Sequence, residues 1–224
     1  MNRLVYAVHH VLLSHCGSID TFKLSTREAA FTTCDFDSWT HFLSKNGIKE
    51  LSLEYVCSAH EFKYELPSCL FSCQQLTHLH ITNVLLEPPD TFHGFRNLVH
   101  LQLDTFVNKT EVLASLVCVC PVLERLVLKN FENLAHFSIQ ALKLNYLYLE
   151  GSLTLPIVLQ NCPALAAISL GIELDNFEFQ VQESICHLVD DLSRLTNLEC
   201  LNISSWFLTM LFQPASNCED TTGT

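Results

Sequence analysis

A leucine spacing of three residues and then two recurs along the whole chain. Its clearest copy is Leu123, Leu126 and Leu128, inside the segment 120–131. Seven further triplets keep this spacing: Ile19/Phe22/Leu24, Ile48/Leu51/Leu53, Leu76/Leu79/Ile81, Leu98/Leu101/Leu103, Leu144/Leu147/Leu149, Leu165/Ile168/Leu170 and Leu198/Leu201/Ile203. Successive triplets begin 29, 28, 22, 25, 21, 21 and 33 residues apart. A period of this kind predicts an array of stacked repeats in which each unit packs on its neighbours.

The second and third core positions of each triplet alternate with other residues, which is the period of a β-strand. Leu126 and Leu128 therefore face one way, and the residues beside them face the other. All intervals except the last fall in the range of leucine-rich repeats, about 20 to 29 residues. We predict an α/β fold, a leucine-rich-repeat solenoid of about eight repeats with a curved parallel sheet and helical or irregular returns. It should span residues 1–207, with a polar, disordered tail over residues 208–224.

The returns between the strands carry their own patterns. Paired prolines at Pro88 and Pro89 favour an extended return over residues 86–95, and residues 66–71 are expected to be extended as well. A weak echo of the repeat over residues 133–141 predicts an additional half-strand. Helices are expected at four places: from Leu4 to Leu12 with Gly17 at the end, after a cap at Asp37 or Ser38 with Gly47 at the end, after a cap at Asn108 or Thr110 as far as Pro121, and from Ile185 to Leu195.

Two more positions recur with the repeat. Cys73, Cys120 and Cys162 each lie three residues before the first leucine of a repeat, so we expect them to be buried free thiols rather than disulfide partners.

Eight residues after the first leucine, where many leucine-rich repeats carry Asn or Cys, this chain has large apolar residues that should fill volume instead. These residues are Val56, Val84, Phe106, Phe131 and Trp206.

The composition excludes several classes of partner. The net charge is −12, which argues against nucleic acid and against an anionic membrane surface, because both are bound by clustered Lys and Arg. No apolar run is long enough to span a bilayer. The first residues do not form a signal peptide, because His9 and His10 interrupt the apolar stretch and no small-residue cleavage site follows. We therefore expect an intracellular protein, cytoplasmic or nuclear.

Six segments occur in a fixed order along the chain. They are F-K-L-S from Phe22, D-x-W-x-x-F-L-S-x-x-G-I-K-E from Asp37, L-P-S-x-L-F-S-C from Leu66, P-P-x-T-F-x-G-F-R-N-L from Pro88, C-P-x-L-E-R-L from Cys120 and L-T-N-L-E-C-L from Leu195. Together they resemble plant F-box/leucine-rich-repeat proteins, particularly the subgroup with a C-terminal FBD region. The resemblance implies the substrate receptor of an SCF-type ubiquitin ligase, in which an F-box recruits a Skp1-type adaptor and the repeats hold the target.

The resemblance covers the repeats, from about residue 3 to residue 207. The residues before Arg3 leave no room for an F-box, and those after Phe207 do not continue as an FBD region. We therefore expect this chain alone not to bind a Skp1-type adaptor. The first hypothesis is a protein interaction scaffold. The alternative is a truncated product that has no function or that acts as a decoy by holding the target without the ligase.

The middle repeats provide the candidate binding surface. If the strands stack in register, one face of the sheet brings together His78, His80, His100, Gln102, Asp104, Arg125, Lys129, Tyr146, Tyr148 and Glu150. These side chains combine hydrogen-bonding groups with aromatic area, which is favoured at protein interfaces. We predict that this face binds a protein target, and a merely solvated sheet face is the alternative.

Other kinds of site are less well supported. His78 and His100 would lie on adjacent strands about 4.8 Å apart, which raises the alternative of a zinc site. We predict no metal site, because no cysteine pair has zinc-finger spacing and a flat strand face rarely brings four ligands together. The sequence contains no catalytic motif and no glycine-rich phosphate loop, so we predict neither an enzyme nor a bound cofactor.

Overall fold

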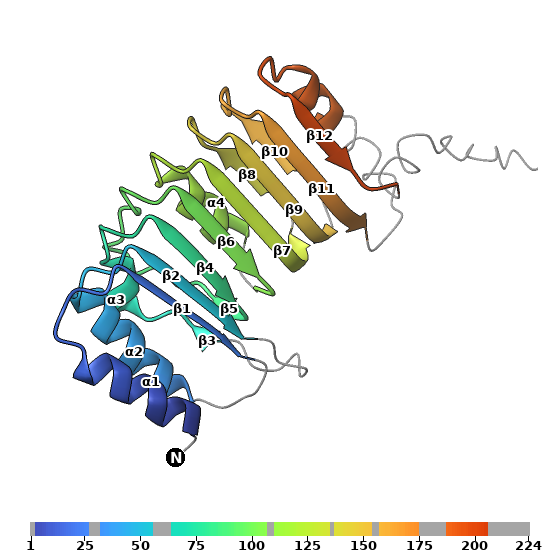
Figure 1. Cartoon of the computed structure of the whole chain (residues 1–224). Coiled ribbons are helices and arrows are strands. Elements are labelled where there is room, and N and C mark those ends of the chain that lie inside the picture. The colour runs from blue at the N-terminus through green and yellow to red at the C-terminus, as the bar shows by residue number, and fades with distance from the viewer. Residues whose placement is uncertain are drawn as a thin grey trace, which may run out of the picture.

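A computed structural model describes residues 3–26, 32–55, 64–106, 110–134, 137–153, 157–174 and 187–205. Its main element is an eight-stranded parallel sheet whose strands stand side by side in sequence order (Figure 1). The strands are β1 (Thr21–Thr26), β2 (Glu50–Tyr55), β4 (His78–Thr82), β6 (His100–Asp104), β7 (Arg125–Leu134), β9 (Tyr146–Leu153), β11 (Ala167–Leu174) and β12 (Cys200–Ile203). Each strand contains one predicted pair of core residues, so the α/β solenoid and its eight repeats are confirmed.

The core positions of neighbouring repeats align across the sheet. Leu101 pairs with Leu79 on one side and with Leu126 on the other, and Leu126 pairs in turn with Leu147. The row continues in register to both outer strands. In the six central repeats the first residue of the triplet is fully buried, with 0% of its surface exposed. These residues are Ile48, Leu76, Leu98, Leu123, Leu144 and Leu165. The repeated leucines therefore form one continuous apolar core between the sheet and the returns.

The returns cover the other face of the sheet. In Figure 1, α4, β8 and β10 lie behind the large sheet, and α1 and α2 lie at its N-terminal end. β8 pairs with β10 and β3 pairs with β5, both in parallel, so parts of the returns form a second, interrupted layer of strands. The bounds are α1 (Arg3–Ser14), α2 (Thr33–Lys45), α3 (Ser68–Phe71), α4 (Thr110–Cys118), β3 (Tyr64–Glu65), β5 (Val84–Leu85), β8 (Phe137–Gln140) and β10 (Ile157–Gln160), and residues 187–193 are helical.

Most of the predicted returns are confirmed. α1 is the first helix of the array and buries Val5 and Leu12. β8 is the predicted half-strand, and the return over residues 86–95 contains no helix and no strand. The helix over residues 187–193 lies within the last predicted helix, whose first residue, Ile185, is outside the described residues.

The predicted start of α2 is wrong. The helix begins at Thr33, so Asp37 and Ser38 lie inside it. The capping residue is Thr32, whose side-chain oxygen accepts a hydrogen bond from the backbone N–H of Asp35 at 3.3 Å. The carboxylate of Asp35 accepts one from the backbone N–H of Thr32 at 2.8 Å. This reciprocal capping box satisfies two backbone donors at once and places the helix cap five or six residues earlier in the chain than predicted.

The structure also corrects the predictions for α3 and for the start of α4. Residues 66–71, expected to be an extended return, contain the single turn α3, which begins directly after Pro67. Proline suits the start of a helix because its missing N–H would have no partner there. α4 stops before Pro121 as predicted, but Thr110 is its first residue, and Asn108 lies outside the described residues.

Apolar residues fill the position eight residues after the first residue of a triplet. Val84, Phe106 and Phe131 are 0%, 3% and 2% exposed, and the ring centroids of the two phenylalanines lie 6.2 Å apart. The prediction that these positions fill volume is confirmed for the described residues. Val56 and Trp206 are not among the side chains that the structure describes.

The residue before each of these apolar positions has a left-handed backbone, which follows the end of β4 and β6 and marks a bulge within β7. Asn83, Thr105 and Asn130 have left-handed φ angles of 54°, 50° and 49°. The backbone N–H of Asn83 donates to the carbonyl oxygen of Asp104 at 2.9 Å, and that of Thr105 donates to the carbonyl oxygen of Lys129 at 3.0 Å. Hydrogen bonds to the next strand therefore satisfy the backbone N–H groups of Asn83 and Thr105, without a ladder of polar side chains.

The recurring cysteines occupy one structural position, as predicted. Cys73, Cys120 and Cys162 are buried, and the carbonyl oxygen of each accepts a hydrogen bond, 3.2 Å long, from the first leucine of its own repeat. Burial raises the pKa of the Cys73 and Cys120 thiols to about 11. All cysteines in the described part of the chain are free thiols. These three therefore pack as small apolar residues.

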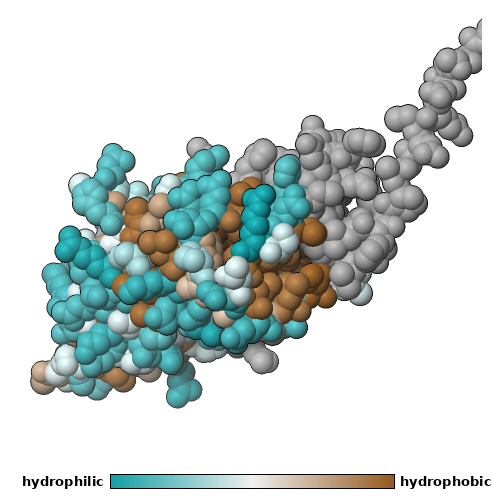
Figure 2. Space-filling view, turned by 90° about the horizontal axis from the view of Figure 1, so that it is seen from above, coloured by the Kyte–Doolittle hydropathy of each residue, from teal (hydrophilic) through white to brown (hydrophobic). Residues whose placement is uncertain are grey.

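The burial of the core decreases toward the last strand. Leu201 of β12, which is equivalent to the buried Leu126, is 44% exposed. In the view from above, hydrophobic residues gather beside the grey part of the chain (Figure 2). β12 pairs only with β11 among the described strands, so its side chains have described neighbours on one side. The predicted tail over residues 208–224 lies outside the described residues.

Candidate functional site

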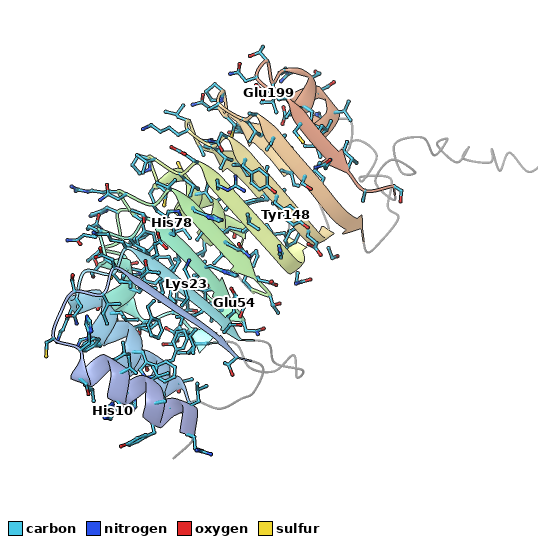
Figure 3. The ribbon with its side chains drawn as sticks, viewed as in Figure 1. His10, Lys23, Glu54, His78, Tyr148 and Glu199 are labelled. Atoms are coloured by element: carbon cyan, nitrogen blue, oxygen red, sulfur yellow. The ribbon has the colours of Figure 1, made fainter. Side chains whose placement is uncertain are left out.

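The candidate site is the exposed face of the large sheet, where the strands present their other side chains. Residues in register form rows across this face. The first row contains His78, His100, Arg125 and Tyr146, the second contains His80, Gln102 and Tyr148, and the third contains Asp104, Lys129 and Glu150. We call these ten residues the central strip. The structure therefore brings together all the predicted site residues, and Figure 3 shows His78 and Tyr148 on this face with Lys23 and Glu54 beyond them.

One residue of this face does not behave as expected. Val127 was predicted to face outward beside Arg125 and Lys129, but it is only 7% exposed. It lies in register between Gln102 and Tyr148, two larger side chains on the neighbouring strands. Alternation along β7 correctly predicts the direction of Val127 but cannot show that larger neighbours surround it.

A histidine cluster occupies one side of the central strip. The rings of His78 and His100 meet edge to face with centroids 5.8 Å apart. His80 Nδ1 lies 3.2 Å from the Ser52 hydroxyl and 3.2 Å from the Glu54 carboxylate. The Nε2 atoms of His80 and His100 are enclosed and have no hydrogen-bond partner among the described residues. Enclosed polar atoms without partners are uncommon in folded proteins, and functional sites are one place where they occur.

Two cation–tyrosine pairs occupy the other side. The guanidinium of Arg125 lies over the Tyr146 ring at 4.0 Å from its centroid, and the ammonium of Lys129 lies over Tyr148 at 5.4 Å. The Tyr148 hydroxyl donates to the carboxylate of Glu150 at 2.6 Å, which raises the pKa of Tyr148 to about 12. These contacts hold long side chains in place before any partner binds, which lowers the entropy cost of binding.

The environment of His100 keeps its ring neutral at physiological pH. Burial, and after it the nearby cation of Arg125 and the rings of His78 and His80, together lower the pKa of His100 from 6.5 to about 4. Burial also lowers the pKa of His80, although the Glu54 carboxylate partly opposes that effect. At pH 7 the strip therefore presents the uncharged rings of His80 and His100.

This arrangement predicts a pH dependence of stability. Below pH 6.5 the unfolded chain binds a proton at His100, whereas the folded chain does so only near pH 4. We expect stability to fall as the pH falls from 6.5 to about 4, and to fall less in the His100→Gln variant, which cannot take up this proton. Urea unfolding at several pH values measures the effect. Parallel stability curves for the two proteins would contradict the prediction.

A surface hollow lies away from the central strip. A hollow of about 300 Å³ between the return over residues 86–95 and α4 is lined by Pro88, Phe92, Glu111, Val112, Ser115, Leu116 and Val119. Sequence reasoning did not find it, because it forms between two returns whose contact no sequence period specifies. Its lining is mostly apolar, and Glu111 is the one charged residue in it.

The described part of the chain shows neither a metal-binding group nor a membrane-spanning helix. No three or more His, Cys, Asp or Glu side chains there are grouped so that they could hold a metal ion. The described helices include none with the length and apolar character needed to cross a membrane.

Comparison with known proteins places the repeats in a family. The family model "FBD-associated F-box protein At5g56370, LRR repeats" matches residues 36–188, which is more than half of the chain. The chain belongs to the leucine-rich-repeat family of FBD-associated F-box proteins. Among the curated members, F-box/FBD/LRR-repeat protein At1g13570 of Arabidopsis thaliana is 41% identical over 202 residues, which are 88% of this chain and 46% of that protein.

Other members of the FBD-associated F-box family match shorter stretches. FBD-associated F-box protein At5g56380 of Arabidopsis thaliana is 32% identical over 101 residues, covering 43% of this chain and 23% of the relative. The F-box/FBD/LRR-repeat protein At5g56420 of the same plant is 29% identical over 122 residues, covering 54% of this chain and 28% of the relative. The chain thus spans less than half the length of these relatives. No solved structure matches the chain.

Proposed function

We propose that the chain is a protein interaction scaffold that holds a protein target on the central strip. In this proposal it works as the substrate-recognition repeats of an SCF-type ubiquitin ligase receptor do, and it carries out no catalytic step. The observation that supports it most is the register of the strip. Ten polar and aromatic side chains from four adjacent strands, β4, β6, β7 and β9, form one ordered surface on a rigid sheet.

The chemistry of the strip supports binding to a protein. Tyrosine and arginine are the residues that most often carry the energy of protein interfaces, and here they are already stacked on one another. The family match supports the same role, since the matched model covers the leucine-rich repeats of F-box proteins. Solenoids bind through extended faces, and the open face of this sheet is of that type.

The test is recovery of a target from an Arabidopsis thaliana extract. The immobilised chain is compared with a strip variant that combines His100→Ala, Arg125→Ala and Tyr148→Ala. We expect the strip variant to lose a target that the unmodified chain retains by about tenfold or more, since loss of a few central residues removes most of the binding energy of an interface.

The chain offers a control of matched composition. Tyr6, His10 and Arg96 are exposed and lie outside the large sheet, so the triple alanine variant at these positions removes the same three residue types elsewhere. This control should retain the target, and circular dichroism should show that both variants are folded. Equal recovery by the strip variant and the unmodified chain would refute the proposal.

A further inference from the structure

The cations of the sheet face differ in what surrounds them. Lys23 forms an ion pair with Glu50 at 3.6 Å. Lys129 lies in register between Asp104 and Glu150, so it has a carboxylate on each neighbouring strand. Lys23 is therefore paired within the chain, and Lys129 has an acidic residue on each side although no carboxylate among the described residues lies within ion-pair distance of its ammonium.

Arg125 has no such partner. It is exposed and lies in register between His100 and Tyr146, neither of which carries a negative charge. Among the described residues, no carboxylate lies within ion-pair distance of its guanidinium, including Glu124, its neighbour in sequence. Its guanidinium instead stacks on Tyr146, at 4.0 Å from the ring centroid. A guanidinium that lies flat on an aromatic ring keeps its N–H donors free along its edge.

The nearby carboxylates are engaged elsewhere. Glu54 contacts His80, and Glu150 accepts a hydrogen bond from Tyr148. Asp104 accepts from the Asn130 side chain at 2.7 Å. The charged and histidine groups that act on His100 are Arg125, His78 and His80, with no carboxylate among them. The first row of the strip therefore has an unbalanced positive charge at Arg125.

We propose that Arg125, held over Tyr146, is the anchor for a single aspartate or glutamate side chain of the protein target. This inference rests on the proposed function and specifies its chemistry. A carboxylate fits because it can accept two parallel N–H bonds from the edge of the guanidinium, while the tyrosine fixes the plane of the pair. The target segment should carry one acidic residue among uncharged ones, because the net charge of −12 repels a run of acids.

The test uses peptides selected from a displayed random library against the unmodified full chain. The selected peptides should share one Asp or Glu at a fixed position. Arg125→Gln should weaken their binding by about tenfold or more, because a charge-assisted hydrogen bond is lost. The matched control is Lys23→Gln, which removes a cation from the same face of the sheet but outside the central strip. It should change the binding by less than about twofold, since Lys23 lies outside the strip and already forms an ion pair with Glu50.

A charge exchange separates direct pairing from a loss of local structure. The Arg125→Glu variant should lose the selected peptide and should regain binding to a version whose acid is replaced by lysine. Nuclear magnetic resonance supplies a second measurement, because a carboxylate bound at Arg125 should raise the pKa of the adjacent His100 from its value of about 4.

The outcomes distinguish this inference from the proposed function. Peptides that depend on the strip but share no acidic residue, or that bind Arg125→Gln unchanged, would overturn the carboxylate anchor and leave the binding face intact. Peptides that bind the strip triple variant as well as the unmodified chain would overturn both proposals. A selection that yields no binding peptide would also count against both.

Discussion

Replacing Leu126 with alanine should lower the free energy of unfolding by about 2–5 kcal/mol, the range for a leucine removed from a well-packed core. Leu126 is 0% exposed and pairs in register with Leu101 and Leu147, so its side chain lies in the middle of the core row. The neighbouring repeats are held by their own backbone ladders and cannot collapse into the cavity. Urea unfolding followed by circular dichroism measures the change.

Leu142 provides the control for this substitution. It belongs to the next repeat but is 62% exposed, so Leu142→Ala removes the same atoms from water rather than from the core. Its effect should stay within about 0.5 kcal/mol, as for most surface substitutions. Equal destabilisation by the two variants would show that the core row does not carry the stability of the array.

Replacing Gly94 with alanine should destabilise the chain by about 3 kcal/mol or more, because backbone strain and a steric clash add together. Gly94 has a φ angle of +96°, which side chains other than hydrogen rarely allow. A Cβ atom there would lie 1.8 Å from the carbonyl oxygen of Val119. The clash is with backbone, so either the turn after α4 or the return before β6 would have to move. Thermal unfolding of the purified variant tests this expectation.

Gly171 is the matched control. It lies in β11 without a positive φ, and a Cβ there would meet Glu150 Cγ at 3.5 Å, an ordinary contact. Gly171→Ala should therefore change the stability by no more than about 0.5 kcal/mol. A Gly94→Ala protein that unfolds at the same temperature as Gly171→Ala would contradict the close packing of these two returns.

The sequence predictions failed where a helix start depends on contacts among a few neighbouring residues. The start of α2 was placed at Asp37 or Ser38 because both are good caps, but Thr32 and Asp35 form a reciprocal pair, which a single-residue rule does not detect. α3 was missed because one turn of helix leaves no periodic signal. The core residues were predicted well, since burial of a regular row of leucines dominates the energy of each repeat.

For the candidate site, the sequence predicted which residues share a face and the structure supplied their contacts. Strand alternation and a constant repeat length are enough to align His100, Arg125 and Tyr146. They do not show that Arg125 stacks on Tyr146, or that the Tyr148 hydroxyl donates a hydrogen bond to Glu150. These contacts depend on side-chain conformations and on the lateral packing of three strands.

The sequence by itself determined the architecture of this protein: eight repeats, one parallel sheet, the buried side of each strand and the family of the repeats. It could do so because the same spacing of buried residues occurs in eight successive repeats, and each repeat packs in register on the next. Only the tertiary structure decided which polar groups of the exposed face are already paired and which are free. Pairing depends on distances of a few ångströms between residues some 20 positions apart in sequence, such as Arg125 and Tyr146, and no local pattern encodes those distances.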